Sequence, residues 1–280
     1  MRVVVLSDNR ALKTDFETEH ALSVYLETDN YTCLLDVGAS GLFTRNAKLM
    51  NIDLRDVDYL FVSHGHADHI GGLPAFLEIN EKAKIVLSSH LLQWEFYSTR
   101  GKSRKISIDF DFDALEDRLI AVEERASFEE DIAVFRGNIT KHPMPKANQT
   151  LFKSSSTGLV NDDFDHELII TFGKERRFLF TGCGHRGLLN ILESATADGV
   201  GQIDWVMGGF HLLDSQGDLD FESAEEIDRL GQTLKHRFPL TRFVTGHCTG
   251  EAAFNQLKSV LRNQLTQFHV GYELEIKTNK

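Results

Sequence analysis

The feature that most constrains this 280-residue chain is residues 63–72, SHGHADHIGG, where three histidines and one aspartate fall within six positions. The preceding residues 57–62 form an apolar run with polar flanks, which is typical of a buried strand. The following residues 73–78 begin with Leu-Pro, which favours a helix start. The sequence therefore predicts a tight turn between a strand and a helix that directs several side chains toward one point.

The chemistry of this turn suits a divalent metal, because imidazole and carboxylate are ligands that zinc and its neighbours accept. We expect His64 and His66 to reach one ion together, and Asp68 and His69 to face a second ion nearby. Two ions about 3.5–4 Å apart can share a hydroxide and clamp a transferring group. A histidine-rich surface turn, or a core histidine with satisfied hydrogen bonds, is the alternative. A single histidine would favour that alternative, but this cluster does not.

The His-x-His-x-Asp-His pattern of residues 64–69 resembles the signature of the metallo-β-lactamase superfamily. The resemblance implies an α/β fold, a four-layer αββα sandwich, with a mono- or dinuclear metal site at one edge of its two sheets. The signature indicates the fold and not a substrate, because the superfamily covers many reactions.

Composition and length narrow the class of protein. Hydrophobic residues make up 41% and charged residues 26%, which is ordinary for a globular chain, and we expect one domain over 1–280. The net charge of −12 argues against nucleic acid as the main partner, because binding phosphates needs clustered Lys and Arg. No stretch approaches the ~20 apolar residues of a membrane span. We therefore expect no membrane partner, a cytoplasmic location, a small-molecule substrate and a possible homodimer.

Hydrophobic patterns along the chain predict strands followed by helices in both halves. The expected strands are 3–6, 21–27, 31–36, 57–62, 84–88, 119–122, 132–135, 167–172, 177–181, 204–208, 241–245 and 270–276, and the expected helices are 42–50, 73–78, 90–97, 187–197, 221–238 and 251–261. The polar segment 98–117 is predicted to be an inserted flap over the site. Residues 142–163, the longest stretch without periodicity, are predicted to form a long active-site loop.

Three later motifs each combine an apolar strand, a glycine and a histidine: FTGCGH at 180–185, VMGGFH at 206–211 and VTGHCTG at 244–250. Each motif places its histidine near the carboxyl end of a strand, the usual location of ligand groups in α/β folds. We expect His185 to complete the first metal position and His247 to join Asp68 and His69. His211 could be a metal ligand or an acid/base that faces the substrate.

Cys183 lies where many superfamily members carry an aspartate that bridges the two metals. A thiolate can bind zinc, but a cysteine can equally be a small buried apolar residue, so both interpretations stay open. The superfamily's Pro-Gly-His-x-x-Gly segment is absent, and His142 and His166 are weaker candidates from that region. The remaining histidines, His20, His90, His236 and His269, are expected to have no metal role.

Further motifs narrow the resemblance to one branch of the superfamily, over nearly the whole chain. They are Asp-Asn at 8–9, EHALS at 19–23, TGCGH at 181–185, GGFH at 208–211 and HCTG at 247–250. This branch contains the dihydropterin–ribofuranosylaminobenzene-phosphate synthase of methanopterin biosynthesis and many uncharacterised relatives. The chain departs from the branch with Ala21 in place of Gly and Gly184 in place of Ser. These small-for-small changes leave metal binding intact and substrate choice open.

Three functions remain in competition. The first is a metal-dependent hydrolase in which a metal-bound hydroxide attacks a small molecule, with or without a phosphate group. The metal would be Zn²⁺, with Mn²⁺ or Fe as alternatives. His211 and Asp68 would have catalytic roles, and Asp36 would orient the ligand histidines from behind.

The second function is a transferase that resembles the synthase and holds a phosphorylated substrate. Candidates for phosphate binding are Arg186 with the N–H groups opening the next helix, Lys141, Lys146 and residues 154–157, although all could be solvated loop residues. The third function is a non-hydrolytic metal-binding protein. Di-iron members of the superfamily carry a carboxylate at the position of His66, so imidazole there favours zinc over redox iron.

Overall fold

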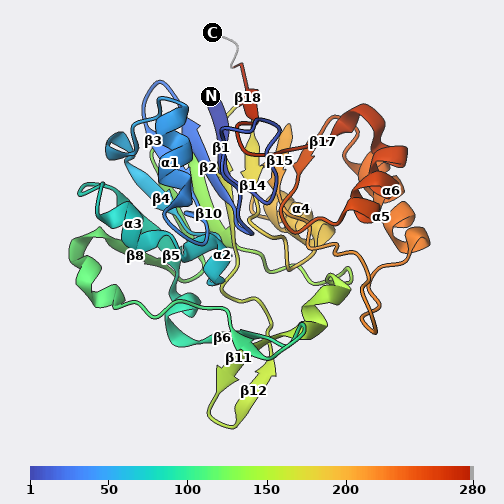
Figure 1. The fold of residues 1–280 in the computed structure, drawn as a ribbon. Helices are drawn as coiled ribbons and strands as arrows, with labels where there is room; N and C mark the ends of the chain where they lie inside the picture. The colour runs from blue at the N-terminus through green and yellow to red at the C-terminus, as the bar shows by residue number, and fades with distance from the viewer. Residues whose placement is uncertain (278–280) are drawn as a thin grey trace.

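The computed structural model describes residues 1–277, and its main elements are two large β-sheets flanked by helices (Figure 1). The first sheet contains β1 (Arg2–Ser7), β2 (Ser23–Glu27), β3 (Thr32–Leu35), β4 (Tyr59–Phe61), β5 (Lys84–Ser88), β8 (Leu119–Val122) and β18 (Glu273–Glu275). The second contains β9 (Arg125–Phe128), β10 (Ile132–Arg136), β13 (Leu168–Phe172), β14 (Phe178–Phe180), β15 (Trp205–Gly208), β16 (Arg242–Thr245) and β17 (Leu265–Gln267).

The two sheets have matching topologies. In the first, with the order β18-β1-β2-β3-β4-β5-β8, strands β1 to β3 are antiparallel and β3, β4, β5 and β8 run parallel. In the second, with the order β17-β16-β15-β14-β13-β10-β9, strands β10, β13 and β14 are antiparallel and β14 to β17 run parallel. Each half of the chain therefore presents the carboxyl ends of neighbouring parallel strands.

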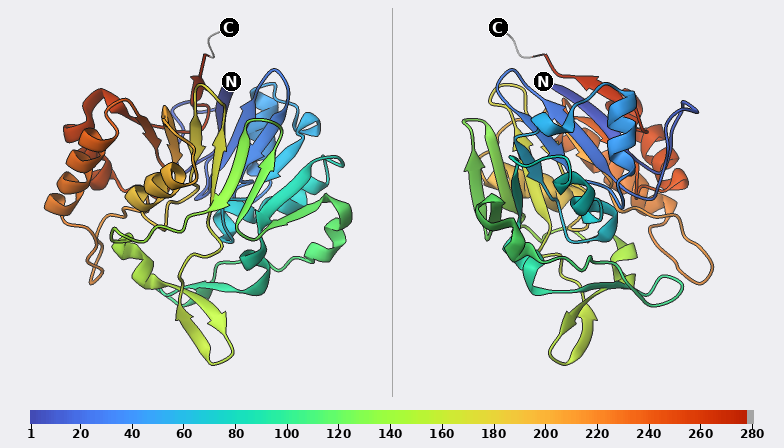
Figure 2. Two further views of the ribbon diagram at one scale, coloured as in Figure 1. Left: turned by 180° about the vertical axis from the view of Figure 1, so that it is seen from behind. Right: turned by 60° about the vertical axis from the view of Figure 1, so that its left-hand side comes forward.

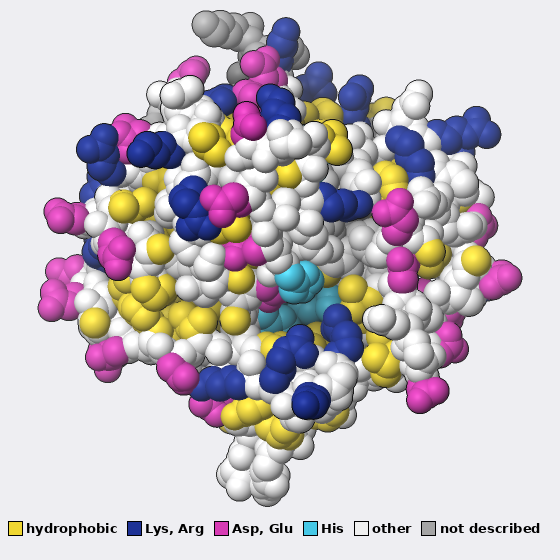
Figure 3. All heavy atoms as spheres, in the orientation of Figure 1, with side chains coloured by type: hydrophobic (Ala, Val, Ile, Leu, Met, Phe, Trp, Pro, Cys, Tyr) yellow, Lys and Arg dark blue, Asp and Glu magenta, His cyan; other side chains and the backbone are white. Residues whose placement is uncertain are grey.

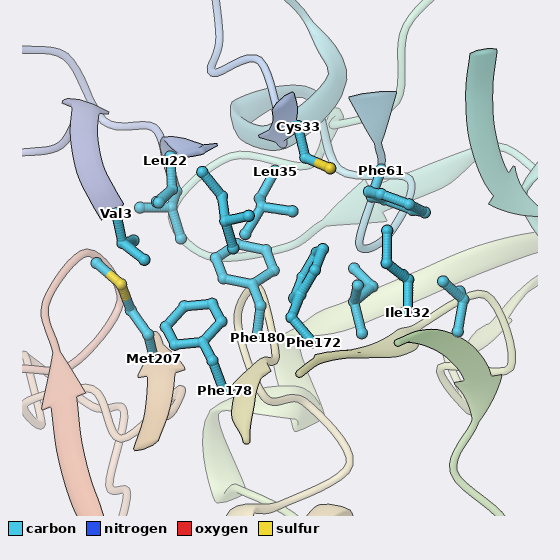
Figure 4. Packing of buried hydrophobic residues seen from close by; sticks show 14 of the residues in the cluster. Val3, Leu22, Cys33, Leu35, Phe61, Ile132, Phe172, Phe178, Phe180 and Met207 are labelled. Carbon is cyan, nitrogen blue, oxygen red and sulfur yellow. The ribbon is translucent and has the colours of Figure 1, made fainter. Parts of the chain in front are cut away.

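The main core lies between the sheets, where apolar side chains from both inner faces interdigitate (Figure 4). Phe61 of β4 packs edge-to-face on Phe172 of β13, with ring centroids 5.8 Å apart, so this aromatic pair joins the two sheets. Helices α1 (Leu42–Leu49), α2 (Ala67–Ile70) and α3 (Leu73–Leu77) cover the outside of the first sheet, and α4 (Leu188–Ala197), α5 (Ala224–Arg237) and α6 (Glu251–Leu261) cover the second. The predicted αββα sandwich is confirmed.

Local signals set the ends of the helices. Helix α5 begins after Ser223, because the Ser223 side chain accepts a hydrogen bond from the backbone of Glu226 and the Glu226 carboxylate binds the backbone of Ser223. Lys235, His236 and Arg237 complement the helix dipole in its last turn. None of the helices among residues 1–277 combines the length and the hydrophobicity that a transmembrane span requires.

A small third sheet lies beyond one end of the sandwich, opposite the chain termini, as the turned views of Figure 2 also show. Its order is β12-β11-β6-β7, formed by β6 (Phe96–Ser98), β7 (Arg104–Lys105), β11 (Leu151–Ser155) and β12 (Gly158–Asn161). The structure also contains 3₁₀ turns at Leu54–Asp56, Ser89–Gln93, Phe112–Arg118, Lys146–Thr150 and Arg262–Gln264.

Several expectations about elements were wrong. Residues 90–97 do not form a helix, because the 3₁₀ turn ends at Gln93 and the chain then extends to pair with β11. The expected long loop 142–163 is partly regular, since β11 and β12 form a hairpin within it. The short strands β9 and β17 were not expected at all. Their segments carry few apolar residues, and each is completed by pairing with one neighbouring strand.

Candidate metal centre

The turn that follows β4 concentrates four polar side chains in a closed environment. His64, His66 and His69 are buried, and the Asp68 side chain is 23% exposed. His64 Nε2 and His66 Nδ1 lie 3.1 Å apart, so these two rings face one point. Asp68 and His69 belong to the one-turn helix α2, which rotates them toward a neighbouring point.

Two loops of the second half complete these two points. The His185 Nε2 atom, from the loop after β14, lies 3.3 Å from His64 Nε2. We call His64, His66 and His185 the first ligand set.

The second ligand set consists of Asp68, His69 and His247. The His247 Nε2 atom, from the loop after β16, lies 3.1 Å from His69 Nε2 and 3.3 Å from Asp68 Oδ2. The structure thus brings together the residues that the sequence analysis grouped, from segments more than 100 positions apart in the chain.

Cys183 lies between the two ligand sets. Its Sγ atom is 3.1 Å from His69 Nε2 and within 4.8 Å of the ligand nitrogens of His64 and His185, and also of those of His69 and His247. The backbone just before Cys183 packs against Ser63, because a Cβ added to Gly182 would lie 2.1 Å from Ser63 Oγ. Gly182 also has φ +61°, a conformation that favours glycine. Cys183 therefore occupies the position common to both sets. Burial raises the pKa of its thiol, so metal binding would have to displace the proton.

Hydrogen bonds behind the turn fix the tautomers of two histidines. His69 Nδ1 lies 2.7 Å from Asp36 Oδ2, to which Ser63 Oγ also donates at 2.7 Å. Because the Ser63 hydroxyl hydrogen is used in this way, its oxygen accepts from His64 Nδ1 at 2.9 Å. Both rings therefore carry their proton on Nδ1 and direct the lone pair of Nε2 inward. Asp36 adopts φ +58°, a conformation that is uncommon outside glycine and concentrates at functional sites.

Asparagine side chains hold the two loop histidines, His185 and His247, by equivalent pairs of hydrogen bonds. Asn148 Oδ1 lies 3.1 Å from His185 Nδ1, and Asn148 Nδ2 donates to the His185 carbonyl. Asn9 Oδ1 lies 3.3 Å from His247 Nδ1, and Asn9 Nδ2 donates to the His247 carbonyl. Each asparagine thus fixes both the backbone and the ring of one histidine, again with Nε2 free.

The donor atoms fit a pair of metal ions. Converging Nε2 lone pairs about 3 Å apart repel one another unless a cation lies between them, and neutral imidazole is the form that binds metals. Burial keeps the rings neutral: it lowers the pKa of His64 and His185 well below the ordinary value and that of His66 to about 3.

The Asp68–His247 pair attracts positive charge. Burial opposes ionisation of Asp68, but His69 and the hydrogen-bonded His247 lower its pKa well below the usual range. Burial also opposes protonation of His247, yet the hydrogen bond to Asp68 and the neighbouring acidic groups raise its pKa to about 9. This pair therefore holds either a proton or a metal ion.

His211 differs from the other buried histidines. It is 4% exposed, and neither of its ring nitrogens has a hydrogen-bond partner among residues 1–277. Its ring lies 4.1 Å from that of His185, and its ligand atom lies within 4.8 Å of the sulfurs of Cys183 and Cys248. His211 has φ +47°, and His247 has φ +50°. Both alternatives from the sequence, a metal ligand and an acid/base, remain predictions.

Sequence reasoning missed two groups around the site, His20 and Asp162, and it ranked a third, His166, only as a weaker candidate. His20, expected to have no role, places Nε2 3.3 Å from Asp68 Oδ2 and stacks on His247. His166 accepts a hydrogen bond from the Gly65 N–H at 3.0 Å and contacts Asp162 at 3.0 Å. His166 therefore stabilises the backbone of the turn that carries the ligand sets. The EHALS motif around His20 was a usable signal, whereas nothing in the local sequence marks Asp162.

The predicted phosphate-binding groups already have protein partners. The backbone N–H groups of His185 and Arg186 donate to the Glu167 carboxylate at 2.7 and 2.9 Å, so the N-terminal approach to α4 is filled. Burial raises the pKa of Glu167 to about 7. Lys146 pairs with Glu226 at 2.6 Å.

Three other candidates also lie outside the ligand sets. Lys141 is exposed, and residues 154–157 form the tip of the β11–β12 hairpin. His142, a weaker metal candidate, contacts Glu193 at 2.6 Å.

Comparisons with known proteins agree with this fold. The family model described as "Metallo-beta-lactamase superfamily" matches residues 18–144. The chain is 24% identical to the 7,8-dihydropterin-6-methyl-4-(β-D-ribofuranosyl)-aminobenzene-5'-phosphate synthase of Methanocaldococcus jannaschii, over 97% of this chain and 95% of that protein. It is 26% identical to an uncharacterized protein of the same organism, over 96% of this chain and 98% of that one.

Among solved structures, the crystal structure of Tm1679, a metal-dependent hydrolase of the β-lactamase superfamily, has a TM-score of 0.81 and 27% identity. The alignment covers 99% of this chain and 100% of that one. The short form of human tRNase Z has a TM-score of 0.56 at 14% identity, with 99% and 100% coverage, and shares the fold.

Proposed function

We propose that this chain, whose residues 18–144 match the metallo-β-lactamase superfamily model, is a metal-dependent hydrolase with a dinuclear site, most suited to zinc. His64, His66 and His185 would hold one ion, and Asp68, His69 and His247 the other. Cys183 lies within reach of both sets, and its thiolate would be a further ligand. The substrate would be a small molecule with a hydrolysable ester or phosphoester bond.

The single observation that carries this proposal is the convergence of ring nitrogens from three separate segments, the turn after β4 and the loops after β14 and β16. The distances between ligand atoms within each set, 3.1–3.3 Å for the closest pairs, are those of ligands that share one ion. Hydrogen bonds fix Nδ1 of four of these histidines, so the arrangement is built and not accidental. Bound divalent ions would supply a nucleophilic hydroxide near neutral pH and polarise the bond under attack.

The chain's own residues would orient and protonate the reacting groups. Asp68 would hold its ion and, with His20 at 3.3 Å, shape the open side of the site. His211 would donate a proton to the leaving group, because its ring nitrogens have no hydrogen-bond partner among residues 1–277, its ring lies beside His185, and imidazole is the commonest general acid in proteins. Its buried position next to His185 would keep competing water away.

The direct test is metal analysis together with turnover of a generic phosphodiester. The full chain is loaded with Zn²⁺ or Mn²⁺, its metal content is measured, and bis-p-nitrophenyl phosphate is supplied. We expect close to two ions per chain and a turnover that His66→Ala removes. His236→Ala, an exposed histidine on α5, is the matched control and should change neither value. A fully loaded protein that hydrolyses no ester or phosphoester contradicts the proposal.

A transferase is the second candidate, and the similarity to the M. jannaschii synthase over 97% of this chain supports it. In that case the same ligand sets would organise a phosphorylated substrate and assist departure of its leaving group without delivering water. A loaded protein that joins a phosphorylated sugar donor to an acceptor, and hydrolyses nothing, favours this candidate. Loaded protein with neither activity would leave the third hypothesis, a non-hydrolytic metal-binding protein.

A further inference from the structure

A basic cluster stands out against the acidic chain. Four of the six residues 100–105, RGKSRK, are Arg or Lys and none is acidic, whereas the whole chain has a net charge of −12. The overall charge conceals this cluster, and the sequence analysis did not identify it. In the structure residues 100–103 belong to the connection between β6 and β7, and Arg104 and Lys105 form β7.

This segment is fixed directly beside the metal turn. The Ala67 N–H donates to the Ile106 carbonyl at 2.6 Å, and Ile106 in turn donates to the Phe96 carbonyl at 2.7 Å. Gly65 packs so closely on the Phe96 ring that an added Cβ would lie 2.4 Å from it. Both ends of the β6–β7 hairpin therefore contact the turn that carries the ligand sets. Figure 3 shows dark-blue Lys and Arg side chains gathered next to the cyan histidines in the hollow.

The cations of the cluster differ in whether an acid neutralises them. Lys105 contacts both Glu95 and Asp109. Among residues 1–277, Arg100, Lys102 and Arg104 have no carboxylate within 4.0 Å. The three cations therefore carry positive charge that no carboxylate within 4.0 Å among these residues neutralises.

Arg100 is the cation most closely associated with the site. Its Nε atom is enclosed without a hydrogen-bond partner. Burial lowers its pKa, as does the charge of Arg104, whereas Cys248, Cys183 and Asp68 at the candidate metal centre oppose this shift. A partly buried guanidinium without an anion is unfavourable, because desolvation is not compensated by a partner. The position is therefore suited to an anion that arrives with the substrate.

We propose that Arg100, supported by Lys102 and Arg104, binds a phosphate group of a small-molecule substrate while the adjacent bond lies over the ligand sets. The part of this inference that concerns the reaction rests on the proposed function, whereas phosphate binding by Arg100 does not. The planar guanidinium matches the geometry of a phosphate and binds it through two N–H groups. A small phosphorylated molecule is favoured over nucleic acid, because three cations in one hairpin do not form the extended basic surface that a polynucleotide requires.

The test measures binding and turnover separately, on the full metal-loaded chain. Binding of inorganic phosphate is followed by calorimetry. Turnover is followed with p-nitrophenyl phosphate, an anionic ester, and with p-nitrophenyl acetate, a neutral one. The variants are Arg100→Gln and Arg100→Lys. Arg176→Gln is the control, with the same loss of charge at a residue that precedes β14 and so lies at the opposite end of that strand from His185.

We expect Arg100→Gln to weaken phosphate binding and to raise KM for the phosphate ester by about tenfold, the effect of losing a hydrogen-bonded ion pair. Turnover of the acetate should stay within about twofold, Arg100→Lys should recover part of the binding, and Arg176→Gln should match the wild type. Equal melting temperatures of the variants establish that the fold is intact.

Unchanged phosphate binding in Arg100→Gln overturns this inference, even if the enzyme hydrolyses esters. Arg100-dependent phosphate binding in a protein that hydrolyses nothing supports the inference and contradicts the hydrolase instead. Tighter Arg100-dependent binding of a single-stranded oligonucleotide than of phosphate would overturn the assignment to a small molecule.

Discussion

The two halves of the chain have matching strand orders, yet they contribute to the candidate metal centre in different ways. The first half supplies His64, His66, Asp68 and His69 from one turn after β4. The second half supplies single groups from loops that follow β14 and β16, with Cys183 between the two ligand sets. In the first half the ligands are neighbours in the sequence. In the second half they are far apart in the sequence, and only the fold brings them together.

The groups that orient the ligands differ in the same way. Asp36 serves the turn with a carboxylate 2.7 Å from His69, a charge-assisted hydrogen bond. Asn148 and Asn9 serve the loops with neutral amides at 3.1 and 3.3 Å. Charge-assisted bonds are roughly twice as strong as neutral ones. The turn is therefore organised before an ion binds, whereas the loops depend more on the ion itself.

The largest expected effect follows from this dependence of the loops on the ions. Removing the ions with a strong chelator should lower the melting temperature by about 10 °C. The reason is that ions present at about 1,000 times their Kd stabilise the folded state by roughly 4 kcal/mol. Calorimetry or circular dichroism of the chain with and without chelator measures this shift. An unchanged melting curve would mean that the second half needs no ion to hold its place.

Substituting one ligand from each half tests whether they are equal partners in the reaction. His69→Ala and His247→Ala should each reduce kcat/KM by more than about 100-fold. This exceeds the loss of about 10–100-fold that follows when a residue hydrogen-bonded to a metal ligand is replaced. Both variants should retain only one ion by metal analysis, because both residues belong to the second ligand set. His236→Ala serves as the control. Two retained ions and normal activity in His247→Ala would remove the second half from the site.

This difference between the halves also explains what the sequence could predict. The turn was predictable because His64, His66, Asp68 and His69 lie next to one another between recognisable strand and helix patterns. His185 and His247 were predicted from a weaker signal, a strand followed by glycine and histidine. Only the pairing of β14, β15 and β16 brings these residues to the same edge as the turn.

Groups held only by tertiary contacts were out of reach. The contact of His20 with Asp68 connects a loop before β2 to a helix after β4, and no periodic pattern encodes such a pairing. The strand β6 was assigned to a helix because Leu91, Leu92 and Trp94 have helical spacing, but pairing with β11 overrides that local preference. The basic cluster was hidden for a different reason, since net charge averages over the chain.

The pH dependence of stability should reveal how the loop of the second half is anchored. Burial raises the pKa of Glu167 from 4.5 to about 7, and its carboxylate holds the His185 and Arg186 N–H groups. The folded state therefore favours the protonated form. This contribution is fully present below pH 4.5 and is lost as the pH rises to about 7, by roughly 3 kcal/mol in the metal-free protein.

Urea unfolding of the metal-free chain at several pH values between 4.5 and 8 measures this slope. Glu167→Gln should flatten it, because the amide does not ionise. An equally steep slope in Glu167→Gln would assign the pH dependence to another group and leave the loop without this anchor.

The smallest expected effect comes from a direct comparison of Asp36 and Asn9, which hydrogen-bond to ligand histidines of the two halves. Asp36→Asn should weaken Zn²⁺ binding by about 10–100-fold, since one substitution disturbs both His69 and the Ser63–His64 chain. Asn9→Ala should weaken it only about fivefold, the equivalent of one neutral hydrogen bond. Competition with a chromophoric chelator measures both affinities, and melting curves of the loaded variants control for folding. If Asn9→Ala proves as harmful as Asp36→Asn, the loops are as firmly organised as the turn, and the second half does not depend on the ion to bring its ligands into position.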